Sequence, residues 1–388
     1  MKTVWRRQMF KRAFLIFMIV SLPVWASPIQ GSRGLINVHS ARVMPKGHIT
    51  LYGGTKYYGK VANFGGQNKA YTLWNVQGFT SINMGINEHL EVGVTPILYQ
   101  DTNSDGGNIL DGQANFPDDL YISFKLGSYS ALESPYIFGG MLYTRIPLAE
   151  QSNIVYENYS AGTLEFGLTG LFTYLSNITF PDEGWKYHVN LGYLNHNDVG
   201  KELTDNPDDP TSNAMSAELL FGTGMLYPAG TFDFTWEINA SYFITKPPVS
   251  AYSREYVSYL TGGVIYKPYP WLTFNTGLDI RLLSGKDQSD YVETSLIKRP
   301  DFPNYPTWRA TIGAKIAILP TSLYSSDEEE LIRKKALERQ QIMQQMMNSD
   351  SETEEAEDEL NRIKSERVKL EDELERLRKL LEKEKKNK

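Results

Sequence analysis

Cysteine is absent from this chain of 388 residues, which excludes a disulfide scaffold and thiolate zinc sites. After residue 30 there is also no run of about twenty apolar residues, the length that a membrane-spanning helix needs. Any membrane character of the mature chain must therefore lie in alternating side chains. The formal net charge of -7 argues against nucleic acid as a general partner.

Recognisable catalytic motifs are missing as well. The five histidines are scattered, and there is no Gly-x-Ser-x-Gly turn, paired-histidine helix or phosphate-binding loop. We therefore expect no enzymatic activity, no catalytic residue and no cofactor.

The chain does contain long stretches with a period of two. In Thr231 to Ile244, one parity is apolar from Phe232 to Ile244, whereas the other carries Asp233, Thr235 and Glu237. Such alternation indicates a β-strand whose two faces meet different solvents. The stretch is long enough to cross a bilayer as a tilted strand, for which about nine to eleven residues suffice.

Similar stretches recur from Gly47 to about residue 320, and we count about twelve. Short links alternate with long polar links without exception, so that Asn87-Glu88 and Pro228-Ala229-Gly230 are tight whereas 59–70, 195–213 and 284–306 are long. Transmembrane barrels have short periplasmic turns and longer external loops. The sequence thus predicts an all-β, antiparallel, up-and-down transmembrane β-barrel over residues 47–320, and a secreted soluble β-protein is the alternative.

The amino terminus predicts export. A basic start with Arg6 and Arg7, an apolar run over 13–20 and the small residue Ala26 indicate a secretory signal peptide over residues 1–26. Residues 27–46 are polar and irregular. We interpret them as a periplasmic lead-in, with a segment tucked into the barrel or a simple tail as alternatives.

Beyond Ser325 aromatics vanish and charged residues dominate, which predicts a periplasmic helical region over residues 327–388. Apolar residues recur there at intervals of three and four, as in a coiled-coil seam. The predicted seam residues are Leu360, Ile363, Leu370, Leu374, Leu377 and Leu381. The alternatives are a coiled coil, formed with a second copy or a periplasmic partner, and a single solvated helix.

The stretch Gly85-Ile86-Asn87-Glu88-His89-Leu90 resembles the periplasmic hairpin of porin-like outer-membrane β-barrels. Residues 34–47 resemble the lead-in to their first strand. This resemblance implies a bacterial outer-membrane location, with membrane lipid as a partner. The extension beyond the last strand resembles OmpA-type proteins, although their peptidoglycan-binding module is absent.

Charged residues on the polar parity are predicted to line the lumen. They are Glu91, Lys125, Arg145, Glu165, Lys186, Glu218, Asp233, Glu237, Asp279, Arg281, Arg309 and Lys315, together with Lys56. Their signs nearly balance, which fits either a hydrated pore or a plug of ion pairs. Because twelve strands enclose more space than the eight that side chains fill, we favour a narrow pore.

One loop has a weak calcium signature. Asp101, Asn103 and Asp105 alternate and Gly106 follows, as in a calcium loop, but Gly112 occupies the twelfth position, where glutamate is expected. A plain external loop is the alternative, and we predict no other metal site.

Together these patterns predict a passive outer-membrane channel for small solutes with a periplasmic coiled-coil arm. The alternative is a structural anchor, in which a plugged barrel holds a coiled coil that docks partners or the cell wall.

Overall fold

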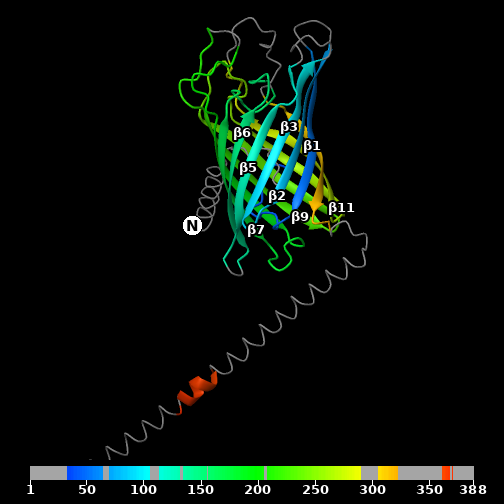
Figure 1. Ribbon diagram of the computed structural model, residues 1–388, viewed down its shortest axis with the longest axis vertical. Helices are drawn as coiled ribbons and strands as arrows, with labels where there is room; N and C mark the ends of the chain where they lie inside the picture. The colour runs from blue at the N-terminus through cyan, green and yellow to red at the C-terminus, as the bar shows by residue number, and fades with distance from the viewer. Residues whose placement is uncertain are drawn as a thin grey trace, which may run out of the picture. The chain divides into compact units, whose positions relative to one another are not determined.

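The computed structural model describes residues 33–63, 70–104, 113–131, 134–154, 156–204, 208–289, 305–321, 361–367 and 369. It divides the chain into two compact units, residues 1–324 and 325–388. The first unit contains the strands (Figure 1). In the second, residues 361–367 and 369 are helical.

The strands of the first unit follow one another with neighbouring strands antiparallel. They are β1 (Ile49–Asn63), β2 (Ala70–Gly85), β3 (Leu90–Ser104), β4 (Gln113–Asn115), β5 (Asp119–Tyr129), β6 (Tyr136–Pro147), β7 (Glu165–Leu175), β8 (Lys186–Asn195), β9 (Ala217–Ala229), β10 (Phe232–Thr245), β11 (Val257–Tyr269), β12 (Leu272–Ser284) and β13 (Trp308–Leu319).

Pairing between β1 and β13 closes the ring. Among the described residues, twelve long strands form the wall of the barrel. The three-residue β4 pairs only with residues 100–102 of β3. The predicted closed antiparallel barrel of about twelve strands is confirmed.

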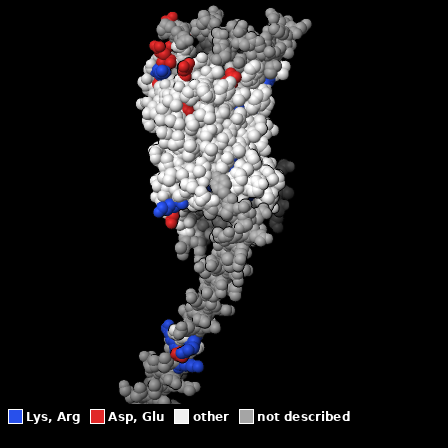
Figure 2. All heavy atoms as spheres, turned by 45° about the vertical axis from the view of Figure 1, so that its right-hand side comes forward, with Lys and Arg blue, Asp and Glu red and all other residues white. Residues whose placement is uncertain are grey.

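The exterior of the barrel is apolar and its interior is polar. In β10, Phe232, Trp236 and Ile238 are exposed by 43%, 49% and 40%, whereas Asp233 and Glu237 are only 7% and 1% exposed. Figure 2 shows that the wall on one face is nearly free of charged side chains, which gather toward the two ends of the barrel. This exterior suits lipid, and each of the twelve long strands pairs with a neighbour on both sides. The strands are therefore the membrane-spanning segments.

The links at one end of the ring are mostly short, as at 230–231 and 270–271, and those at the other end are mostly long, as at 196–216. We call these the short-turn end and the long-loop end. The predicted strict alternation in length is wrong at one point. Residues 59–63, predicted as loop, continue β1, which pairs with β2 as far as Asn63 and Ala70 and leaves only residues 64–69 as a link. The link at 176–185, at the short-turn end, is longer than this link at the long-loop end.

Candidate functional site in the barrel lumen

Residues 33–46, which we call the inner segment, lie inside the barrel toward its short-turn end. Leu35, Ile36, Val38 and Ala41 are at most 7% exposed. The segment makes hydrogen bonds from Glu91 in β3 on one side to Asp279 in β12 on the other. Of the alternatives for residues 27–46, the tucked segment is the correct one for the described part.

Glu237 of β10 holds one end of the inner segment. Its carboxylate accepts hydrogen bonds from the backbone N–H groups of Ile36 at 2.8 Å, Asn37 at 2.7 Å and Val38 at 2.9 Å. Three donors converging on one carboxylate satisfy a charge that would be costly to bury alone. Glu237 therefore binds the backbone of the inner segment.

The rest of the inner segment is held in the same way by side chains of the wall. Asn190 accepts from the backbone N–H of His39 at 2.7 Å and donates to its carbonyl at 2.8 Å. Thr173 accepts from Ala41 at 2.8 Å, and Glu91 accepts from Met44 at 2.8 Å. A segment without regular structure can be buried here because the wall supplies its backbone partners.

Glycines in the wall make room for this segment. A Cβ placed on Gly263 of β11 would lie 2.1 Å from Cδ1 of Ile36, and one on Gly277 of β12 would lie 2.4 Å from it. On Gly127 of β5 it would lie 2.1 Å from the carbonyl oxygen of Ala41. Glycine at these positions allows the inner segment to pack directly against the strands.

In the half of the lumen near the long-loop end, buried charges form a chain across β5 to β10. Arg145 pairs with Asp119 and lies 3.6 Å from Glu165. His196, directly after β8, lies 3.1 Å from Glu165 and 3.1 Å from Glu218, and Glu218 accepts from Ser241 at 2.6 Å. Burial alone lowers the pKa of His196, but the two carboxylates outweigh it and raise the pKa to about 10.

A second pair lies across β12 and β13. Arg309 donates to Asp279 at 2.8 Å, and its guanidinium also lies 5.1 Å from the centre of the Tyr259 ring. Asp279 accepts from Thr261 at 2.8 Å and from Asn37 of the inner segment at 3.2 Å. The balance of signs predicted for the lumen is thus largely realised as ion pairs.

Apolar residues share the lumen with these charges, which the sequence reading did not anticipate. Met141, Tyr143, Leu171, Leu220 and Tyr259 form a buried cluster with Tyr305. They lie on the same parity as the charged residues of their strands, because Tyr143 precedes Arg145 by two residues and Leu220 follows Glu218 by two. The lumen is therefore narrower than a lining of charged residues alone would make it.

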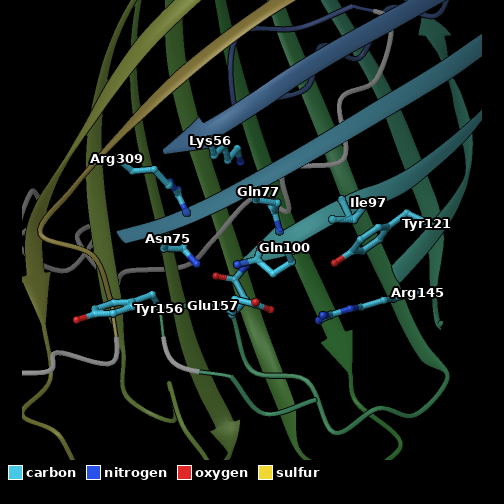
Figure 3. Close-up of a pocket in the computed structure, with 11 residues that line it drawn as sticks. Lys56, Asn75, Gln77, Ile97, Gln100, Tyr121, Arg145, Tyr156, Glu157 and Arg309 are labelled. Carbon is cyan, nitrogen blue, oxygen red and sulfur yellow. The ribbon is translucent and has the colours of Figure 1, made fainter. Parts of the chain in front are cut away.

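A small polar cavity, partly open to solvent, remains in the half near the long-loop end (Figure 3). Its lining residues are Lys56, Asn75, Gln77, Ile97, Gln100, Tyr121, Arg145, Tyr156, Glu157, Asn158 and Arg309.

The predicted lumen residues fall into two groups by burial. Glu91, Lys125, Arg145, Glu165, Glu218, Asp233, Glu237 and Asp279 are at most 8% exposed, as is Lys56. Lys186, Arg281, Arg309 and Lys315 are partly buried. Only Lys56, Arg145 and Arg309 line the cavity. Near the short-turn end, Lys125 lies 3.7 Å from Glu91, and Asp233 pairs with Lys267 at 2.6 Å.

Two of the partly buried residues contact links between strands. Lys186 pairs at 2.9 Å with Asp182 in the link before β8. Arg281 donates at 2.8 Å to the carbonyl of Tyr305, just before β13.

Several residues of the site were not predicted. Asp119 and His196 continue the inward parity of β5 and β8, so extending each strand by one step would have found them. Glu157 lies in the long link after β6, where periodicity is lost and no sequence signal indicates its position. Burial, reinforced by Asp118, raises the pKa of Glu157 well above its usual value.

Asp101, the first residue of the weak calcium signature, lies in β3 and not in a loop. Its Oδ2 accepts from Tyr99 at 2.9 Å and from Trp74 at 3.3 Å. The side chain of Asn103 and all of Asp105 lie outside the described residues. Within the described ranges, no group of three or more His, Cys, Asp or Glu side chains is arranged to hold a metal ion.

Other predictions fall largely on parts of the chain that are not described. These are the signal peptide over residues 1–26 and the seam residues Leu360, Leu370, Leu374, Leu377 and Leu381. Ile363 is described, and it is helical and 62% exposed. Among the described residues, no helix is long and apolar enough to cross a membrane.

Comparison with known proteins gives structural similarity without a family. No family model matches the chain, and no curated protein matches it in sequence. An outer membrane channel from Pseudomonas putida F1 is similar, with a TM-score of 0.46, 11% identity, and coverage of 72% of this chain and 98% of that one.

Two further solved structures are similar at lower scores. The NanC porin has a TM-score of 0.42 and 10% identity, and the match covers 69% of this chain and 98% of that one. A deletion mutant of the monoaromatic hydrocarbon channel TodX has a TM-score of 0.37 and 12% identity, with 77% and 97% coverage. We base the function of this chain on its own geometry.

Proposed function

We propose that this chain is a bacterial outer-membrane channel for small polar solutes, narrowed at its periplasmic end by its own inner segment. The observation that carries this proposal is a closed ring of strands with an apolar exterior and a polar lumen that retains a cavity. Long loops face outward in such barrels, so the short-turn end and the inner segment face the periplasm.

Conductance in planar bilayers tests this proposal. Purified, heat-modifiable wild-type protein should give small, discrete current steps. Deletion of residues 33–46 should increase the step size severalfold, because it removes the chain that crosses the lumen. Absence of current steps from both proteins, with folding verified by heat-modifiable migration, would contradict the channel.

The second candidate is a structural anchor, and the inner segment is the observation that favours it. Its backbone is bonded to the wall at many points, as expected of a permanent plug. On this proposal the carboxyl-terminal region over residues 327–388 forms a periplasmic coiled coil that docks a second copy, another protein or the cell wall.

Removing residues 327–388 separates the two candidates. A channel should retain its current steps and its permeability to small solutes in cells. If the protein is an anchor, cells with this variant should lose envelope integrity, measured as leakage of periplasmic enzymes, whereas the permeation of small solutes should not change. The barrel wall and the inner segment are unchanged in this variant. Heat-modifiable migration verifies that its barrel is folded, so neither result can be attributed to misfolding.

A further inference from the structure

Three polar side chains meet the cavity with atoms that lack a hydrogen-bond partner among the described residues. They are Nζ of Lys56, both amide atoms of Gln100, and Oε1 of Glu157. Lys56 is 2% exposed and Gln100 is 0% exposed. In Figure 3 Lys56 descends from β1 toward the space that Gln100 and Glu157 border from below. Buried polar groups are normally paired, so such a cluster indicates a missing partner.

The charge of the lining distinguishes between kinds of ligand. The guanidinium groups of Arg145 and Arg309 are already paired with Asp119 and Asp279. Lys56 has no ion pair of this kind among the described residues, and burying an ammonium without one is costly. Glu157 does not compensate it fully, because the raised pKa of this carboxyl favours its neutral form. An anion is the complement of this lining.

The uncharged groups define the ligand further. Gln100 presents a donor and an acceptor, and the neutral carboxyl of Glu157 offers the same two functions. A carboxylate on the ligand can accept hydrogen bonds from the Lys56 ammonium and from the Gln100 amide nitrogen. The Gln100 amide oxygen needs a hydrogen-bond donor on the ligand. A hydroxyl next to the carboxylate satisfies both demands.

We propose that this cavity is a binding site for small hydroxycarboxylates, with Lys56 as the carboxylate ligand and Gln100 as the group that recognises the hydroxyl. This inference rests on the proposed channel function for the route by which the ligand enters. It assigns the solute class that the channel would prefer. Binding itself does not require conduction, so the two can fail separately.

The test is calorimetric titration of the full-length, detergent-solubilised protein with sodium lactate, sodium propionate and lactamide. Propionate lacks the hydroxyl, and lactamide lacks the charge. Lactate should bind saturably, propionate several times more weakly, and lactamide at least tenfold more weakly. Equal binding of lactate and lactamide, or no saturable binding of lactate by folded protein, would overturn the site.

Two variants and a matched control locate the binding. Lys56→Met should weaken lactate binding at least tenfold, and Gln100→Leu should remove the preference for lactate over propionate. Lys60→Met removes the same charge four residues along β1, outside the cavity lining, and should leave binding unchanged. Unaltered lactate affinity in Lys56→Met would refute the assignment.

A stability measurement excludes a purely structural role. Lys56→Met and Gln100→Leu remove buried polar atoms that lack a hydrogen-bond partner among the described residues, so both variants should fold at least as stably as the wild type. If these side chains served only the fold, their loss should lower stability along with affinity. Wild-type protein that binds lactate but gives no current steps would contradict the channel function and support the binding site. Wild-type protein that gives current steps but does not bind lactate would support the channel function and contradict the binding site.

Discussion

The two halves of the lumen use similar wall residues in different ways. Near the short-turn end, Glu237 accepts three backbone N–H groups of the inner segment and Glu91 accepts one. Near the long-loop end, atoms of Lys56, Gln100 and Glu157 are left without a hydrogen-bond partner among the described residues. The same kind of polar strand face thus holds the chain itself in one half and leaves polar atoms without a hydrogen-bond partner among the described residues in the other.

The largest expected effect concerns the charge chain near the long-loop end, where His196→Gln should lower the free energy of unfolding by about 3–5 kcal/mol at pH 7. The folded-state pKa of about 10 lies above the usual 6.5. The stabilisation should therefore be complete below about pH 6.5 and be lost as the pH rises through about 10.

Urea unfolding of both proteins from pH 6 to pH 10.5 measures this. The difference between wild type and variant should shrink as the pH rises. His89→Gln, in the turn after β2, is the control and should change little. A difference that stays constant over this range would show that His196 does not carry the charge.

The next effect concerns the short-turn half. Glu237→Gln places an amide where three N–H donors converge, so docking of the inner segment should weaken by about 3 kcal/mol. Trypsin should then cut the folded protein at Arg42 or Lys46 on the order of a hundred times faster.

Asp233→Asn makes the same charge change four residues away on the same face of β10, where the partner is Lys267. It should leave this cleavage slow. If Glu237→Gln were cut no faster than Asp233→Asn, the inner segment would not depend on Glu237, and the contrast between the two halves would be lost.

A smaller effect is expected from the space that glycine provides. Gly263→Val should displace Ile36 and weaken docking by about 1–3 kcal/mol, visible as larger or noisier current steps. At the adjacent Gly262 a Cβ would meet nothing within 4 Å, so Gly262→Val should conduct like the wild type. Identical behaviour of the two variants would contradict close packing of the segment on β11.

The smallest effect has the opposite sign. Lys56→Met should raise the free energy of unfolding by about 1 kcal/mol, because it removes a buried amine without a hydrogen-bond partner. Urea unfolding measures the change, with Lys60→Met as the matched control. A clear loss of stability in Lys56→Met would mean that the Lys56 amine is paired in the folded protein.

Much of the wall followed from the sequence, because alternation is a local property. The twelve long strands agree with the predicted count of about twelve, and β10 matches the predicted stretch Thr231 to Ile244. Lumen residues such as Glu91, Glu237 and Asp279 were assigned by parity alone. Errors arose where parity carries no information, in the extension of β1 into a predicted loop and in the position of Asp101.

The sequence by itself determined that this chain has strands with one apolar and one polar face, in a number and order that suit a barrel. Only the tertiary structure decided what the polar face contacts. The inner segment has no periodicity, and its hydrogen bonds join residues about 200 positions apart, as between Asn37 and Glu237. Such pairs exist only once the ring has closed, so no local pattern could reveal that one half of the lumen is filled and the other retains a cavity.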